Sequence, residues 1–292
     1  MTVLLFLAQT VRIAIPYLFA AAGGALAERA GVVSLTLEGF MLGGAFGAVL
    51  GAHYTGSAAA GVLAGVLAGL LLGGLHAVAS IRFRANQVVV GVAINLLAVG
   101  ITRFFLQLAF DSSSNSPRVT GFATTSGSTL AALLQNPLVW LGVAVLPALA
   151  YVVDRTPFGL RVRAAGEHPE AATSVGVNVK RVRYAAVLGS GALAALGGVY
   201  LALDQHQFTD SMTAGRGFIA LAAVIFGRWQ PLRAAVACLL FAAAETLQIQ
   251  LQTIQLIPSQ FVAMIPYILT IVAVAGVVGR STAPSALGRT DE

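Results

Sequence analysis

The chain has 292 residues, of which 58% are hydrophobic and only 10% are charged. Soluble domains carry about 25% charged residues, so this composition excludes an ordinary soluble globular protein. It predicts a polytopic integral membrane protein that is in contact with the lipid bilayer. The formal net charge of +6 does not by itself indicate nucleic acid as a partner, because cations in a membrane protein follow its topology.

Apolar stretches of about 20 residues, the length that crosses a bilayer, recur along the chain. A shorter piece, Phe218–Phe226, is predicted to extend at its ends or to be one arm of a broken helix. The sequence therefore predicts an all-α helical bundle of about nine membrane segments, one of them short or broken, as a single transmembrane domain over residues 1–292. The full-length candidates are Val3–Ala27, Val32–His53, Ala58–Ile81, Gln87–Phe110, Pro137–Val153, Arg183–Leu203, Ala234–Leu251 and Phe261–Val278.

Basic residues are distributed unequally between the two sides that these spans define. If all nine pieces cross, one side keeps only Arg118 and Arg216. By the positive-inside rule, the richer side is cytoplasmic. The N-terminus is then predicted outside and the C-terminus inside, with an external loop at about 111–136. The cations on the cytoplasmic side are Arg29, Arg82, Arg84, Arg155, Arg161, Arg163, Lys180, Arg181, Arg183, Arg228, Arg233, Arg280 and Arg289.

A polar segment at about 154–182 lies on the predicted cytoplasmic side. Its Glu-Ala-Ala sequence at residues 170–172 is followed by Gly176. This pattern resembles the EAA loop by which membrane subunits of ATP-binding-cassette (ABC) transporters dock onto their ATPase. A short helix of small residues can enter a groove, and the glycine lets the chain turn out again. An ordinary basic inner loop is the alternative. The candidate coupling residues are Gly166, Glu167, Pro169, Glu170, Ala171, Ala172 and Gly176.

Charged residues within the predicted spans are the candidates for a polar interior. Such charges cost free energy in lipid, so they usually face a cavity and pair. At 100° per residue, Glu245 and Gln248 share a helix face, and so do Asn95 and Arg103. Lining of a translocation pathway and hydrogen bonding between helices both remain open. The pathway candidates are Glu38, Asn95, Arg103, Glu245 and Gln248.

Small residues recur at a four-residue spacing that indicates close helix packing. Gly61, Gly65, Gly69 and Gly73 form one such stripe. In lipid, glycine stripes let backbones approach closely. Residues 35–51 and 212–227 also form a weak internal repeat, since both run from polar residues into a Gly/Ala/Phe-rich apolar stretch.

The sequence lacks the motifs of nucleotide-binding, metal and nucleophilic catalytic sites. The only lysine, Lys180, does not follow a phosphate-binding glycine loop. The four histidines are isolated from acidic clusters, so no metal site is predicted. No Gly-x-Ser-x-Gly elbow occurs. The chain is therefore not expected to be an enzyme or to bind a cofactor itself.

Four segments together resemble the permeases of the branched-chain amino acid/ribose/nucleoside ABC importer family. They are residues 28–42, 85–97, 166–179 and 213–231, in the order of the family's blocks, and the resemblance covers about residues 10–280. Residues 213–231, together with Asn86-Gln87, look most like the nucleoside-type members.

The resemblance implies a subunit of an ATP-driven importer in a bacterial plasma membrane. Its partners would be a second permease, an ATPase that holds ATP and Mg, and an external lipoprotein that delivers a small polar substrate. The cargo implied is a nucleoside, with a simple sugar or a branched-chain amino acid as alternatives. A proton- or ion-coupled secondary transporter, with Glu38 or Glu245 as the coupling carboxylate, is the alternative from another class.

Overall fold

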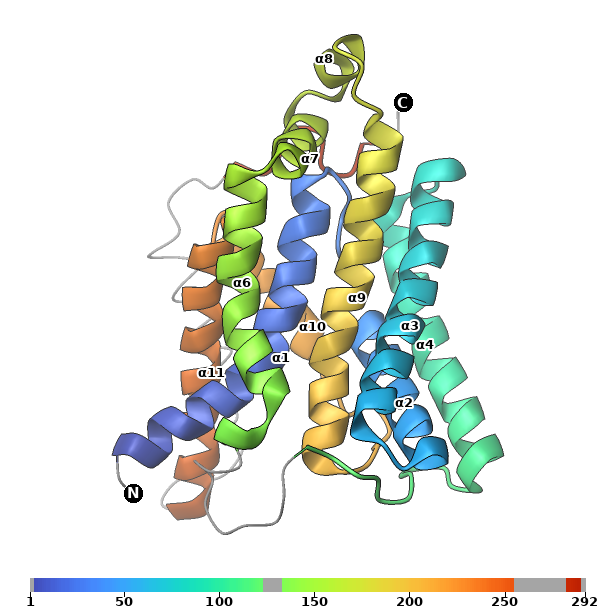
Figure 1. Cartoon of the computed structure of the whole chain (residues 1–292), viewed down its shortest axis with the longest axis vertical. Coiled ribbons are helices and arrows are strands. Elements are labelled where there is room, and N and C mark those ends of the chain that lie inside the picture. Colours follow the sequence, from blue (N-terminus) through green and yellow to red (C-terminus); the bar gives the residue numbers. More distant parts are fainter. Residues whose placement is uncertain (1–2, 123–132, 255–281, 290–292) are drawn as a thin grey trace.

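The structure is a computed structural model that describes residues 3–122, 133–254 and 282–289. Long helices run side by side along the longest axis of the molecule, and a short helix, α8, projects at one end (Figure 1). In the described residues, the only β-pairing is an isolated bridge between Asn115 and Thr209. The elements are α1 (Val3–Arg29), α2 (Leu37–Thr55), α3 (Ala58–Ala77) with the π-helical turn η1 (Val78–Arg82), α4 (Gln87–Phe110), α6 (Pro137–Arg155), α7 (Pro157–Glu167), α8 (Pro169–Ser174), α9 (Val179–Gln205), α10 (Arg216–Phe226) and α11 (Pro231–Ile254).

The described residues contain six helices that are long and apolar enough to cross a membrane, so the predicted count of nine segments is not confirmed. Helix α2 falls outside this group, because Glu38 and the polar end at His53 lower its hydropathy. Helix α10 has 11 residues, which at 1.5 Å per residue covers about half of the ~30 Å hydrocarbon core. The predicted span Phe261–Val278 lies outside the described residues.

Polar side chains fix where several helices begin. Asn86 accepts the N–H groups of Val88 and Val89 at 3.0 and 3.2 Å, so α4 begins at Gln87 as the sequence predicted. Asn136 and Asn178 start α6 and α9 in the same way. Such caps satisfy backbone donors that have no partner within the helix.

Glycine contacts hold the centre of the bundle together, as the stripe predicted. Helix α3 packs on α2 and α9, and α9 also packs on α1. All four stripe glycines are buried. A methyl group on Gly65 would lie 2.6 Å from the Gly44 carbonyl oxygen, and one on Gly69 would overlap Gly191 and Ala195. The stripe is therefore where backbones touch.

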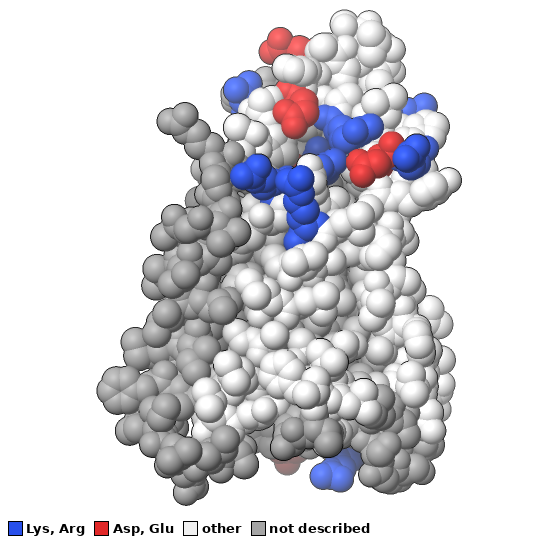
Figure 2. Space-filling model, turned by 90° about the vertical axis from the view of Figure 1, so that its left-hand side faces the viewer, with Lys and Arg blue, Asp and Glu red and all other residues white. Residues whose placement is uncertain are grey.

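The two ends of the bundle differ in charge. The N-terminus lies at the end opposite α7 and α8, whereas residues 282–289 lie beside α7 (Figure 1). Figure 2 shows Lys and Arg gathered at the α7–α8 end, above a largely uncharged body. The segment from the end of α6 to the start of α9 contributes Arg155, Arg161, Arg163, Lys180 and Arg181.

The glycine contact at α3 and α9 can be tested by Gly69→Leu. The larger side chain would push α3 from α9, so thermal unfolding in detergent should show a loss of about 3 kcal/mol or more. Gly100→Leu is the matched control, because Gly100 on α4 has nothing within 4 Å of a built methyl group. Equal stability of the two variants would contradict this packing.

Candidate functional site

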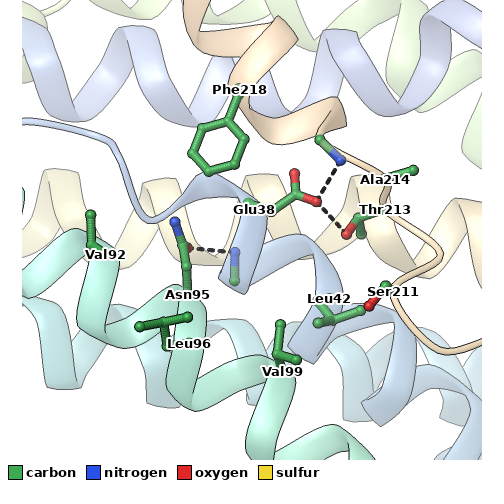
Figure 3. A pocket seen from close by; sticks show the side chains of 12 residues that line it. Glu38, Leu42, Val92, Asn95, Leu96, Val99, Ser211, Thr213, Ala214 and Phe218 are labelled. Atoms are coloured by element: carbon green, nitrogen blue, oxygen red, sulfur yellow. Dashed lines mark hydrogen bonds between the residues drawn. The ribbon is translucent and has the colours of Figure 1, made fainter.

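A cavity of about 340 Å³ lies where α2, α4 and the segment leading into α10 meet. Figure 3 shows its side chains converging from these elements. Both segments of the weak internal repeat contribute residues to the cavity, since residues 35–51 contain the start of α2 and residues 212–227 contain α10. The cavity is lined by Glu38, Gly39, Leu42, Val92, Asn95, Leu96, Val99, Ser211, Thr213, Ala214, Gly215 and Phe218.

Glu38 joins α2 to the N-terminus of α10. Its Oε1 accepts the Thr213 hydroxyl at 2.6 Å and the Gly215 N–H at 2.8 Å, and its Oε2 accepts the Gly217 N–H at 2.7 Å. Backbone N–H groups at a helix N-terminus have no partner within the helix and carry partial positive charge. Glu38 therefore neutralises the end of α10 that faces the cavity.

The approach of α2 to α10 requires glycine. A methyl group on Gly217 would lie 2.5 Å from the Glu38 nitrogen and 2.6 Å from its Cα. The chain before α10 is also tightly turned, because Ser211, Ala214 and Gly215 have φ values of 55°, 46° and 82°. The carboxylate and the turn hold each other in place.

Asn95 of α4 is a second polar group on the cavity wall. Its Oδ1 accepts the Gly39 N–H at 2.8 Å (Figure 3). Its Nδ2 donates to the Leu35 carbonyl at 2.8 Å. The same amide therefore links α4 to the start of α2 and lines the cavity. An amide can donate two hydrogen bonds and accept two, so capacity remains for a bound ligand.

A second polar cluster lies between α1, α9, α10 and α11. Glu245 accepts Arg216 at 2.9 Å and also accepts the Tyr17 hydroxyl. Arg12 pairs with Asp204 at 2.8 Å. A cavity of about 280 Å³ is lined by Arg12, Asp204 and Arg216 among others. Arg216, one of the two cations predicted on the external side, forms the first turn of α10.

The predicted pathway residues separate into different places. Glu38 and Asn95 line the first cavity, and Glu245 belongs to the second cluster. Arg103 has a half-exposed side chain that pairs with Asp210 at 2.8 Å, and it lines neither cavity. Gln248 is half-buried on α11, about one turn after Glu245.

The predicted coupling segment folds as two short helices at the cation-rich end. Gly166, Pro169 and Ala172 are buried and hold the segment on the bundle. Glu167, Glu170, Ala171 and Gly176 face outward, together with Val175, which is 78% exposed. Gly176 has a φ of 85°, so a glycine turns the chain from α8 toward α9. Within the Glu-Ala-Ala sequence, Glu170 and Ala171 are thus exposed and Ala172 is buried.

The C-terminal residues 282–289 are attached to the same end of the bundle. The Ala286 N–H donates to the Gly166 carbonyl at 2.9 Å, and the Gly288 N–H donates to the Gly31 carbonyl at 3.2 Å. Ser285 also bonds to Glu167. The segment therefore links α7 to the turn between α1 and α2.

Sequence reasoning missed the partners of the intramembrane charges. Asp204 and Asp210 lie at the end of α9 and just beyond it, and they pair with Arg12 and Arg103. The rule that charges in lipid pair could have suggested a search for acidic partners near span ends. It could not have identified them, because the pairs are 192 and 107 residues apart.

The described residues hold no cluster of three or more His, Cys, Asp or Glu side chains suited to a metal ion. Their arrangement is that of a multi-pass membrane transport protein, with two cavities to which charged or amide side chains contribute and a short-helix segment at one end. The family described as branched-chain amino acid transport system / permease component matches residues 6–274. The chain belongs to this family of ABC transporter permeases.

Two curated relatives match nearly the whole chain. The guanosine ABC transporter permease protein NupQ of Bacillus subtilis (strain 168) is 40% identical, with 96% of this chain and 93% of the relative covered. The nucleoside ABC transporter permease protein NupC of Lactococcus lactis subsp. cremoris (strain MG1363) is 35% identical, with 94% and 92% covered.

A solved structure shares the fold. It is described as an inward-facing conformation of a metal-chelate type ABC transporter, with a TM-score of 0.52 and 18% identity over 90% of this chain and 84% of that one. At this identity the likeness concerns the fold alone.

The half-buried charge pair of the second cluster generates a stability prediction. Arg216→Met or Glu245→Leu alone leaves an unpaired charge, so each should cost about 1–3 kcal/mol of unfolding free energy. The double variant should be more stable than either single variant, as measured by thermal unfolding in detergent.

The half-exposed pair Arg103–Asp210 provides the control, and its double replacement should change stability little. Strictly additive losses at Arg216 and Glu245 would contradict the pairing.

Proposed function

We propose that this chain is the membrane-spanning permease subunit of an ATP-driven importer for nucleosides. The observation that carries the proposal is the cavity at Glu38, in a chain closely similar to permeases named for guanosine and nucleosides. Its volume of about 340 Å³ suits a small molecule. Phe218 offers a half-exposed ring at the rim for stacking, and Asn95 offers an amide for hydrogen bonds.

The charge of the cavity favours a neutral cargo. The N–H groups of Gly215 and Gly217 would attract an anion, but Glu38 already occupies them. A phosphate or a free carboxylate would meet the Glu38 carboxylate at this wall. A nucleoside meets this constraint better than a branched-chain amino acid, whose carboxylate needs a positive partner. A simple sugar has no aromatic plane to stack on Phe218.

The orientation follows from the cations at the α7–α8 end. The positive-inside rule makes this end cytoplasmic, with the N-terminus outside and residues 282–289 inside. The loop at residues 111–122 then faces the exterior. It bonds to the segment leading into the cavity, since the Val119 N–H donates to the His206 carbonyl at 2.8 Å and the Asp210 N–H donates to the Ser114 carbonyl at 2.8 Å. An external lipoprotein would deliver the nucleoside at this end.

The energy source in this proposal is a partner subunit. ABC permeases work with an ATPase and a second permease, and ATP and Mg would bind to the ATPase rather than to this chain. The docking surface consists of the outward face of α8, with Glu170 and Ala171, and of Val175, which directly follows the helix. Family membership favours this arrangement over the secondary-transporter alternative.

The proposed cargo and energy source are tested by uptake into proteoliposomes that contain the permeases, ATPase and receptor. Radiolabelled guanosine should accumulate only with Mg-ATP on the ATPase side, and a protonophore should leave uptake unchanged. Accumulation driven by a pH gradient without ATP would establish the secondary transporter. Competition by sugars or branched-chain amino acids, with none by other nucleosides, would overturn the cargo.

The docking surface is tested by Val175→Asp. Losing an apolar contact and burying a charge should reduce the co-purifying ATPase at least about tenfold. Ser113→Asp adds the same charge at an exposed position at the opposite end and should retain the ATPase. Wild-type recovery of the ATPase with Val175→Asp would mean that this face does not dock.

A further inference from the structure

The turn after α10 is held in a conformation that its residues disfavour. Arg228 and Trp229 have φ values of 52° and 57°, in the left-handed region. Side chains with a Cβ adopt this region at a cost in free energy, so the surroundings must stabilise it. Trp229 is 6% exposed, although it lies in a connection between helices.

Two hydrogen bonds fix Trp229 to the end of α1. Its indole Nε1 donates to Oε2 of Glu28 at 2.5 Å, and its carbonyl accepts Nε of Arg29 at 2.6 Å. Glu28 is 3% exposed, and its Oε1 accepts the Ser34 N–H at 3.2 Å. A buried carboxylate is costly to leave unpaired, so this contact specifies where the turn sits.

The same end of α1 touches the coupling helices directly. Gly166 lies so close to the Arg29 carbonyl that a methyl group would overlap it. Arg183 donates to the Ala30 carbonyl at 3.2 Å and to the Ala165 carbonyl at 3.4 Å. The end of α7 and the end of α1 therefore form one packed unit.

Helix α10 connects this unit to the cavity. The turn that follows its C-terminus is bound by Glu28 through Trp229, and its N-terminal turn is bound by Glu38 at the cavity wall. With 11 residues it is short and is held at both ends. A shift of α7 can thus reach the cavity through a single short helix.

We propose that the Glu28–Trp229 contact transmits movement of the α7–α8 segment to α10, and thereby opens or closes the cavity at Glu38. These two are positioning residues, since neither lines the cavity or the outward face of α8. The inference rests on the proposed ABC permease function, because the movement it transmits comes from the ATPase.

The test uses Trp229→Phe in the complete complex. Phenylalanine keeps an aromatic ring but removes the N–H donor to Glu28. Guanosine taken up per ATP hydrolysed should fall about tenfold, while the ATPase co-purifies at the wild-type ratio. The second tryptophan, Trp140, is 58% exposed on α6, so Trp140→Phe is a matched control and should couple normally. Normal coupling in Trp229→Phe, or equal loss in the control, would overturn the proposal.

A double variant covers the case in which Trp229→Phe does not assemble. Glu28→Gln with Trp229→Phe removes the charge together with its indole donor, so no buried carboxylate loses its donor, and the amide oxygen can still accept the Ser34 N–H. It should assemble and remain uncoupled. An assembled double variant with wild-type uptake per ATP would overturn the proposal.

A readout independent of cargo separates this inference from the proposed function. A bimane fluorophore on Phe218→Cys, with Cys238→Ala, reports the cavity where Phe218 lies at the rim. Addition of ATP should change its emission in the wild-type background and not with Trp229→Phe. If the wild-type complex takes up no guanosine, the proposed cargo is wrong. The emission change then still tests whether the Glu28–Trp229 contact transmits movement to the cavity. An unaltered response in Trp229→Phe would overturn it.

Discussion

The interior of this permease depends on the hydrogen bonds between the Glu38 carboxylate and the N-terminus of α10. Three donors, the Thr213 hydroxyl and the N–H groups of Gly215 and Gly217, converge on one side chain at 2.6–2.8 Å. Hydrogen bonds to a charged group are among the stronger ones in proteins. The contact lets a half-length helix begin inside the bundle, and it sets one wall of the cavity.

The two ends of α10 are held by carboxylates that lie ten positions apart in the sequence, Glu28 and Glu38. Between them the chain makes the turn from α1 to α2, which also contacts α7, Arg183 and the C-terminal segment. One short stretch of chain therefore touches α7 at one end and the cavity at the other. This arrangement gives a physical basis for linking an ATPase at one surface to a site in the interior.

Much of the fold could be predicted because hydropathy and caps are local. Helix α4 has the predicted bounds, since Asn86 caps it and polar residues follow it. The glycine stripe on α3 correctly indicated close packing. The number of membrane segments was less predictable: α2 contains polar residues that its burial among other helices tolerates, and α10 is only half-length.

The site was predictable only in part, because its contacts join residues that are far apart in the sequence. Glu38 and Asn95 could be selected as polar groups in apolar spans, and both line the cavity. The partner of Glu38 lies 175 or more residues away, so no local pattern reveals it. Trp229 had no signal of its own, because an aromatic residue after an apolar helix is ordinary in a membrane protein.

Hydrogen exchange at residues 213–218, compared between wild type and Glu38→Gln, tests the central claim most directly. Glutamine has a single side-chain oxygen that can accept hydrogen bonds. The NH2 group that replaces the other oxygen would face a backbone N–H, which is also a donor. The account predicts that amides in this segment exchange about tenfold faster or more, while α4 and α9 keep their protection. Glu170→Gln, which makes the same change on exposed α8, should leave the segment unaffected. Unchanged protection in Glu38→Gln would contradict the claim that this carboxylate holds α10 in place.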